Sequence, residues 1–168
     1  MTGRGGTARW LALGLAMAAG LALGGEPARA ERGSPPLPSA IEAAAAWFVV
    51  ERFLNGSNDL RAVRGLYGET VDYFDQGLRR RDQVMADKRA YFSRWPKRIF
   101  TPDLGTLRTR TIPGPDGRRD VEVTLEVDFD VFGPNRRANG RSEVALVLAE
   151  RGEGFIVLAE GGRVIGRR

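Results

Sequence analysis

The chain has 168 residues, with 26 Lys and Arg against 21 Asp and Glu, and it contains neither His nor Cys. The absence of Cys excludes disulfides, thiolate nucleophiles and Cys-ligated metal sites, and the absence of His excludes Ser-His-Asp and Cys-His catalysis. A hydrophobic content of 42% beside 28% charged residues is typical of a globular chain. The length of the chain suits one domain.

The first thirty residues have the pattern of a secretory signal peptide. Two arginines precede an apolar run at residues 10–23, and Ala28 and Ala30 supply the small residues of a cleavage site. The run is shorter than the roughly 20 residues that span a bilayer. We therefore predict cleavage between Ala30 and Glu31 and export to the periplasm or the medium. Membrane contact is expected only if the signal segment stays uncleaved.

The mature chain is expected to begin with a flexible leader and to continue as one domain. Residues 31–38 contain three prolines, which favour a flexible extended segment. Ser39 and Glu42 have the spacing of a capping box and predict the start of a helix that ends near Asn55. The single folded domain is therefore expected over residues 39–168.

The next elements follow from hydrophobic spacing. In the first helix, this spacing turns Trp47 and Phe53 toward the core. A second helix is predicted at residues 60–66, a strand at residues 70–75, and a third helix at residues 81–95.

After the third helix the hydrophobic period changes from helical to two, which indicates strands. The predicted strands lie at residues 104–112, 120–132, 141–150 and 155–165. The order of elements predicts an α+β domain, with three N-terminal helices packed on a strongly curved, mixed, mainly antiparallel sheet.

Two stretches of the sequence resemble a known superfamily. VDYFDQG (residues 71–77) and VMADKRAYFSRWPKRIF (residues 84–100), together with the order of elements, are similar to the nuclear transport factor 2-like (SnoaL-like) superfamily, and to an exported bacterial branch of it. The resemblance implies a cystatin-like cone, in which helices cover the concave face of a bent sheet and leave a pocket at the open end. It implies no single activity, because such folds serve as isomerases, dehydratases, epoxide hydrolases, assembly modules and carriers.

Lys88 is the most informative charged residue. In the third helix it lies on the same arc as Tyr91 and Trp95, which should face the sheet. A charged side chain there must reach the rim, pair with a carboxylate or line a cavity. Asp72 and Asp75 on the preceding strand are the expected ion-pair partners. The alternatives make Lys88 a pocket cation for an anionic ligand, or a base.

Tyrosines near Lys88 add hydrogen-bond donors to the expected pocket. An isomerase-type site would need a carboxylate opposite such a tyrosine. Asp128 and Asp130 are the available carboxylates, but strand alternation turns both away from the apolar face. No catalytic residue is therefore assigned. The candidate pocket residues are Tyr73, Lys88, Tyr91 and Trp95.

The remaining charged clusters are interpreted as surface features. The acidic residues of the strand at residues 120–132 are expected to pair with Arg108 and Arg110 across the sheet rather than to bind a metal. The arginines at residues 79–81 suggest a solvated turn, or a weak contact with an anionic surface. No metal, cofactor or nucleic acid is expected.

The sequence favours an exported module of the cone fold that binds a small ligand or an envelope protein, without catalytic activity. The alternative is a cofactor-independent isomerase, dehydratase or hydrolase that uses a carboxylate and a tyrosine in the pocket. A third interpretation is an assembly module whose interior is filled by side chains. The presence and lining of a pocket distinguish among the three.

Overall fold

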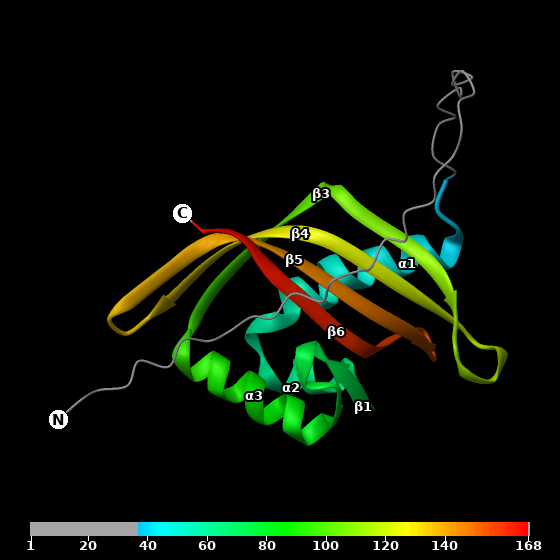
Figure 1. Ribbon diagram of the computed structural model, residues 1–168, viewed down its shortest axis with the longest axis horizontal. Helices are drawn as coiled ribbons and strands as arrows, with labels where there is room; N and C mark the ends of the chain where they lie inside the picture. The colour runs from blue at the N-terminus through cyan, green and yellow to red at the C-terminus, as the bar shows by residue number, and fades with distance from the viewer. Residues whose placement is uncertain (1–36, 168) are drawn as a thin grey trace, which may run out of the picture. The chain divides into compact units, whose positions relative to one another are not determined.

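The computed structural model describes residues 37–167 (Figure 1). The predicted signal peptide, its cleavage site between Ala30 and Glu31, and nearly all of the Pro-rich leader lie outside this range. Within the described residues, none of the helices has the length and apolar character needed to cross a bilayer.

Six strands form one mixed sheet in the order β2-β1-β6-β5-β4-β3. Neighbouring strands are antiparallel except for β1 and β6, which are parallel. The α+β class and the mixed, mainly antiparallel sheet are thus confirmed. The strands are β1 (Tyr67–Tyr73), β2 (Leu78–Arg80), β3 (Lys97–Pro113), β4 (Arg119–Gly133), β5 (Arg136–Arg151) and β6 (Gly154–Arg167).

The strands β3 to β6 form an arch, and the α-helices of the described residues lie on its concave side (Figure 1). The four arching strands are 14 to 17 residues long, so each extends well beyond a typical strand and bends along its length. The helical elements are α1 (Ala40–Trp47), which continues as a π-helix η1 (Phe48–Leu54) and a 3-10 turn η2 (Asn55–Asn58), then α2 (Leu60–Gly65) and α3 (Arg81–Arg94).

The predicted helix starts are present. Ser39 Oγ accepts a hydrogen bond from the Glu42 backbone N–H, and the Glu42 carboxylate accepts one from the Ser39 backbone N–H at 2.8 Å. Asp59 caps α2 by accepting from the Arg61 backbone N–H at 2.8 Å. These caps satisfy backbone groups that the first turn of a helix leaves without partners.

The face that α1 turns to the core differs from the prediction. Trp47 is 61% exposed, and Phe53 is only half-buried, whereas Ala45, Phe48 and Val49 are buried. Residues 43–50 are all apolar, so their spacing alone does not select one face. Packing selects it instead, since Phe48 lies against Phe155 of β6 with ring centroids 5.7 Å apart.

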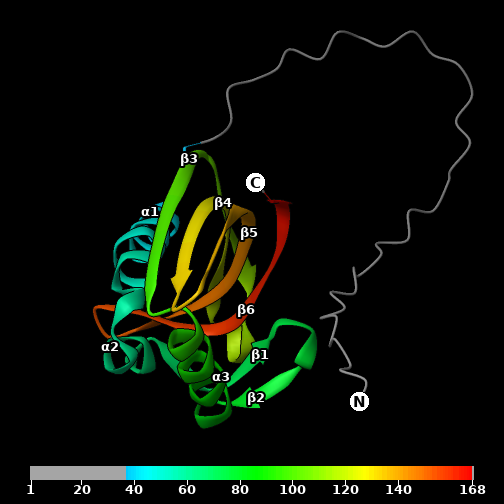
Figure 2. The ribbon, with the colours of Figure 1, turned by 90° about the vertical axis from the view of Figure 1, so that its left-hand side faces the viewer.

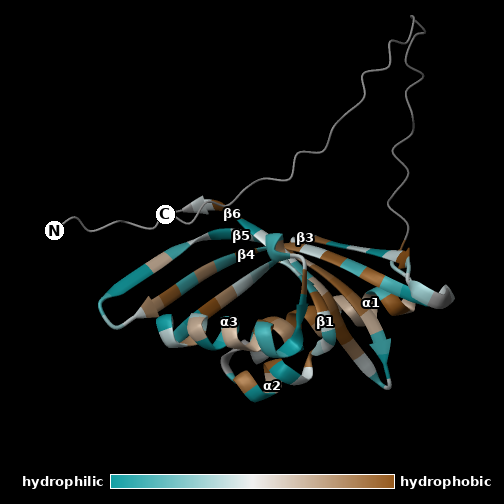
Figure 3. Cartoon of the chain, turned by 60° about the horizontal axis from the view of Figure 1, so that its bottom comes forward, coloured by the Kyte–Doolittle hydropathy of each residue, from teal (hydrophilic) through white to brown (hydrophobic). Residues whose placement is uncertain are grey.

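The alternation predicted for β4 is confirmed and forms the centre of the core. Val121, Val123, Leu125 and Val127 are at most 1% exposed, and the residues between them face the other side of the sheet. Figure 3 shows the resulting alternation of hydrophobic and hydrophilic bands along the long strands. Trp95, which was expected to face the sheet, is half-buried at the C-terminal end of α3.

A short edge strand replaces the turn expected around the arginines. Gly77 has φ of 68°, a left-handed conformation that suits glycine, and it turns the chain from β1 into β2. Arg79 of β2 then lies opposite Val71 of β1, on the face that carries buried residues. The hairpin places β1 and β2 beside α3 (Figure 2).

Candidate functional site

A buried ion pair lies between the helices and the sheet. Glu160 of β6 is 6% exposed and stands opposite Leu146 on the face that carries the core. Lys88 of α3 donates to Glu160 Oε1 over 2.5 Å, and the Tyr67 hydroxyl of β1 donates to Glu160 Oε2. Both oxygens of the carboxylate are therefore hydrogen-bonded, as a buried charge requires.

Aromatic rings surround the ammonium group of this pair. Lys88 Nζ lies 5.7 Å from the ring centroids of Tyr67 and Tyr73, and 5.8 Å from that of Phe53. At these distances the electron-rich faces of the rings attract a cation. One carboxylate and three rings thus hold the Lys88 ammonium, and we call this group of five residues the Lys88 cluster.

The partner of Lys88 is Glu160, and not Asp72 or Asp75 as the sequence suggested. Val71 and Tyr73 are the buried residues at this end of β1, so strand alternation exposes Asp72 between them. Asp75 follows in a 3-10 turn and is also exposed. Neither carboxylate lies on the face that meets α3.

A β-bulge explains why sequence reasoning missed Glu160. The register between β5 and β6 shifts at Leu158, because Val157 pairs with Leu148 while Ala159 pairs with Val147. The extra residue reverses the alternation, so Val157 and Glu160 both point inward. The sequence offered one weak signal, namely a carboxylate directly after the apolar run at residues 155–159.

A polar cleft of about 390 Å3 adjoins the Lys88 cluster, between the β1–β2 hairpin and α3. Tyr73 belongs to both: its ring faces the Lys88 ammonium, and its side chain lines the cleft together with Asp87. The cleft is lined by Tyr73, Gln76, Arg79, Gln83, Ala86 and Asp87.

The three tyrosines near α3 are held in their protonated form. Burial is the main cause that raises the pKa of Tyr67, Tyr73 and Tyr91 above the ordinary value. The negative charge of Glu160 adds to the shift for Tyr67 and Tyr73. Such side chains serve as hydrogen-bond donors at neutral pH.

The same arrangement of helices and strands occurs in solved structures. A proposed dehydratase of the NTF2-like family from Streptomyces avermitilis matches with a TM-score of 0.62 at 9% identity, over 76% of this chain and 99% of that one. A proposed scytalone dehydratase from Novosphingobium aromaticivorans has a TM-score of 0.61 at 9% identity, over 76% and 87%. A protein with a cystatin-like fold from Caulobacter vibrioides has a TM-score of 0.59 at 13% identity, over 75% and 91%.

The chain has the nuclear transport factor 2-like fold. At these identities the likeness concerns the fold alone. No protein-family model matches the sequence, and no curated protein matches it.

In this nuclear transport factor 2-like fold, the four predicted pocket residues occupy different places. Tyr73 lines the cleft, and Lys88 lies behind it in the ion pair. Tyr91 and Trp95 lie further along α3 and do not line this cleft. Tyr91 contacts the ring of Phe92, and Trp95 lies under the Arg136 guanidinium, 4.7 Å from ring centroid to Cζ.

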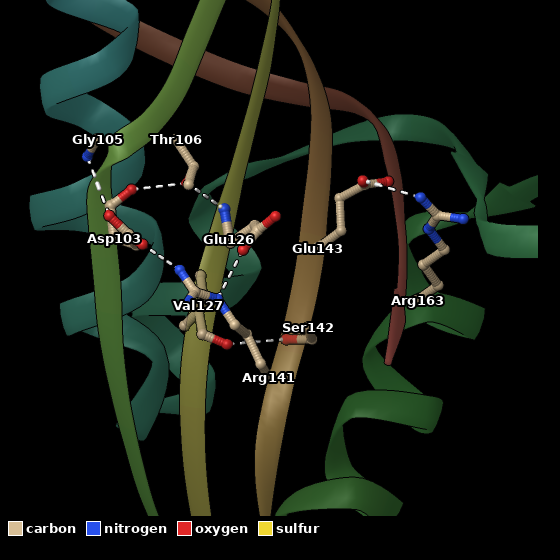
Figure 4. Close-up of polar contacts among 9 residues, drawn as sticks. All are labelled: Asp103, Gly105, Thr106, Glu126, Val127, Arg141, Ser142, Glu143 and Arg163. Atoms are coloured by element: carbon tan, nitrogen blue, oxygen red, sulfur yellow. Dashed lines mark hydrogen bonds and ion pairs between the residues drawn. The ribbon is translucent and has the colours of Figure 1, made fainter. Parts of the chain in front are cut away.

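The opposite face of the sheet carries ion pairs between strands, and Figure 4 shows those of Arg141 and Arg163. Arg141 of β5 lies between Asp103 of β3 and Glu126 of β4, with 2.6 Å from its Nε to Glu126 Oε2. Arg110 pairs with Glu122 across β3 and β4, as predicted. Arg108 instead donates to backbone carbonyls of its own strand.

Glu122 and Glu126 of β4 are thus neutralised by arginines. Within residues 37–167, no group of three or more Asp and Glu residues is arranged to hold a metal ion. A smaller hollow of about 200 Å3 lies on this face, and outward residues such as Asp72, Glu122 and Val147 line it. This hollow also reaches Glu160 of the ion pair, but the cleft at Tyr73 is larger and is lined by both a cation and a carboxylate.

Proposed function

We propose that the protein is an exported module that binds a small molecule in the cleft between the β1–β2 hairpin and α3, without transforming it. The observation that carries this proposal is the lining of the cleft, which combines a tyrosine hydroxyl, two amides, one cation and one carboxylate. A few polar groups that converge on a hollow are typical of ligand sites. Export rests on the sequence pattern of residues 1–30.

The internal acid–base groups support binding rather than catalysis. A general base needs a free acceptor within reach of the substrate. Both oxygens of Glu160 already accept hydrogen bonds, from Lys88 and Tyr67, and the side chains of Glu160 and Lys88 are only 7% and 16% exposed. The Lys88 cluster therefore acts as a structural support for Tyr73 at the inner wall of the cleft.

A catalytic alternative would use Tyr73 and Asp87, which line the same cleft. Burial is the main cause that raises the pKa of Tyr73, so its hydroxyl stays protonated. Asp87, the carboxylate of this lining, is exposed to solvent, so the cleft does not enclose an acid–base pair around a reacting group. The proposed dehydratases that share the fold support this alternative through the fold alone.

An NMR titration with a set of small polar compounds tests the proposal. We expect shifts confined to residues 73–87 for compounds that bind, with the added compound unchanged after prolonged incubation. Tyr73→Phe should weaken binding, whereas Tyr91→Phe, outside the cleft, should leave it unchanged. Shifts confined to the opposite face of the sheet would contradict the site, and conversion of a bound compound would contradict the non-catalytic assignment.

A further inference from the structure

Arg79 is the cation of the cleft, and it has no counterion among the described residues. It is half-buried on β2, and it takes part in none of the ion pairs formed by residues 37–167. Its Nε is buried without a hydrogen-bond acceptor in the part of the chain that the structure describes. A buried donor without a partner is unfavourable, and a planar carboxylate matches a guanidinium best.

Asp87 provides the opposite charge on the α3 wall of the same cleft. Its carboxylate is exposed and, like the Arg79 guanidinium, is absent from the ion pairs of residues 37–167. Arg79 and Asp87 therefore line one hollow without forming an ion pair with each other. Each of them would be stabilised by an opposite charge placed between them.

The rest of the lining is neutral and polar. Gln83 Oε1 already accepts a hydrogen bond from the Arg80 backbone N–H at 2.9 Å, which leaves its amide group as a donor. Gln76 adds a second amide, and Ala86 is small. A volume of about 390 Å3 suits a small polar molecule.

We infer that the cleft binds a small zwitterion, with its carboxylate on Arg79 and its ammonium group on Asp87. This inference rests on the proposed binding function and names the class of ligand. Such a molecule satisfies both charges at once and brings no net charge into the cleft. A simple carboxylate would meet Asp87 as a like charge, and a simple amine would meet Arg79 in the same way.

Calorimetric titration of the full chain with matched compounds tests the inference. The zwitterions are glycine, β-alanine and γ-aminobutyrate, and each is compared with the carboxylate and the alkylammonium that lack one of its charges. We expect at least one zwitterion to bind about tenfold to hundredfold more tightly than both of its analogues, as charged hydrogen bonds predict.

An analogue that binds as tightly as its zwitterion overturns the inference and leaves the proposed function standing. If none of these zwitterions binds while other compounds still shift the NMR signals of residues 73–87, the inference is overturned and the proposed function stands. Failure of every compound at this cleft removes the proposed function as well.

Charge-removing variants identify which residue meets which end of the ligand. Arg79→Met should reduce the affinity of the zwitterion to that of the alkylammonium, and Asp87→Asn should reduce it to that of the carboxylate. Two matched controls should change neither affinity: Arg80→Met, at the next and exposed position of β2, and Asp75→Asn, exposed outside the cleft. Melting curves establish that each variant is folded. Unchanged affinity in folded Arg79→Met overturns the assignment.

Discussion

Lys88 of α3 and Glu160 of β6 are separated by 72 positions in the sequence, yet the Lys88 Nζ and Glu160 Oε1 atoms lie 2.5 Å apart. The contact links the third helix to the only strand that pairs with β1 on one side and β5 on the other. It also places the ammonium against Tyr73, so one buried ion pair supports the wall of the polar cleft.

We expect Lys88→Met to lower the free energy of unfolding by about 3–5 kcal/mol, because Glu160 would remain buried without its counterion. The double variant Lys88→Met/Glu160→Gln should recover much of this loss, since the stranded charge is gone. Denaturant unfolding measures both values. Arg89→Met, the exposed neighbour on α3, is the control and should change stability by less than about 0.5 kcal/mol. Unchanged or higher stability of Lys88→Met would instead favour a role of Lys88 as a ligand-binding cation.

Tyr67→Phe should lower the free energy of unfolding by about 1–3 kcal/mol, because the buried Glu160 carboxylate loses one of its two donors. The ring remains, so packing against Phe53, with centroids 6.3 Å apart, is kept. Urea unfolding measures the change. Tyr91→Phe is the matched control, since no hydrogen bond to Glu160 is lost there. Equal losses in the two variants would show that the hydroxyl of Tyr67 contributes nothing specific.

Glu42 should make stability depend on pH in acid. Its carboxylate accepts hydrogen bonds from Ser39 and from the backbone N–H and hydroxyl of Thr111, and these bonds lower its pKa from 4.5 to about 2. A lowered pKa in the folded state means that the contribution is complete above pH 4.5 and is lost as the pH falls toward 2. The stability difference between the wild type and Glu42→Gln should therefore shrink over this interval, as unfolding curves at several pH values can measure. A difference that does not change between pH 6 and pH 2 would contradict the assignment.

Leu125→Ala should cost about 2–5 kcal/mol of unfolding free energy, because the side chain is 1% exposed at the centre of β4. Trp47→Ala removes a larger side chain but should change stability by less than about 0.5 kcal/mol, because Trp47 is 61% exposed. Parallel denaturant unfolding compares the two variants. A larger loss for Trp47→Ala would show that α1 packs with the opposite face.

Mass spectrometry of the protein recovered from its host should find Glu31 as the first residue. The prediction rests on the basic start, the short apolar run and the small residues before position 31. Recovery of the intact chain from the membrane fraction would contradict cleavage. Replacing Ala28 and Ala30 with leucine should block processing and serves as the control.

Features that depend on neighbours along the chain were predictable from the amino-acid sequence. The capping box of Ser39 and Glu42 and the two-residue alternation of β4 follow from local hydrogen bonding and from the pleat of a strand. Apart from the short edge strand β2, the order of helices and strands was predictable for the same reason, and together with the stretches at residues 71–77 and 84–100 it indicated the fold.

Which side chains meet across the sheet depends on tertiary contacts. The sequence left the core face of the first helix open because residues 43–50 are all apolar, and packing of Phe48 against Phe155 selects that face. The position of Glu160 depended on one extra residue at Leu158, which reverses the direction of the side chains after it, as far as a second register shift at Ile165. Arg79 lines the cleft because the left-handed conformation of Gly77 reverses the chain and allows β2 to pair with β1. Bulges and strand pairings depend on contacts between segments that are distant in the sequence. A local hydrophobic pattern does not predict such contacts.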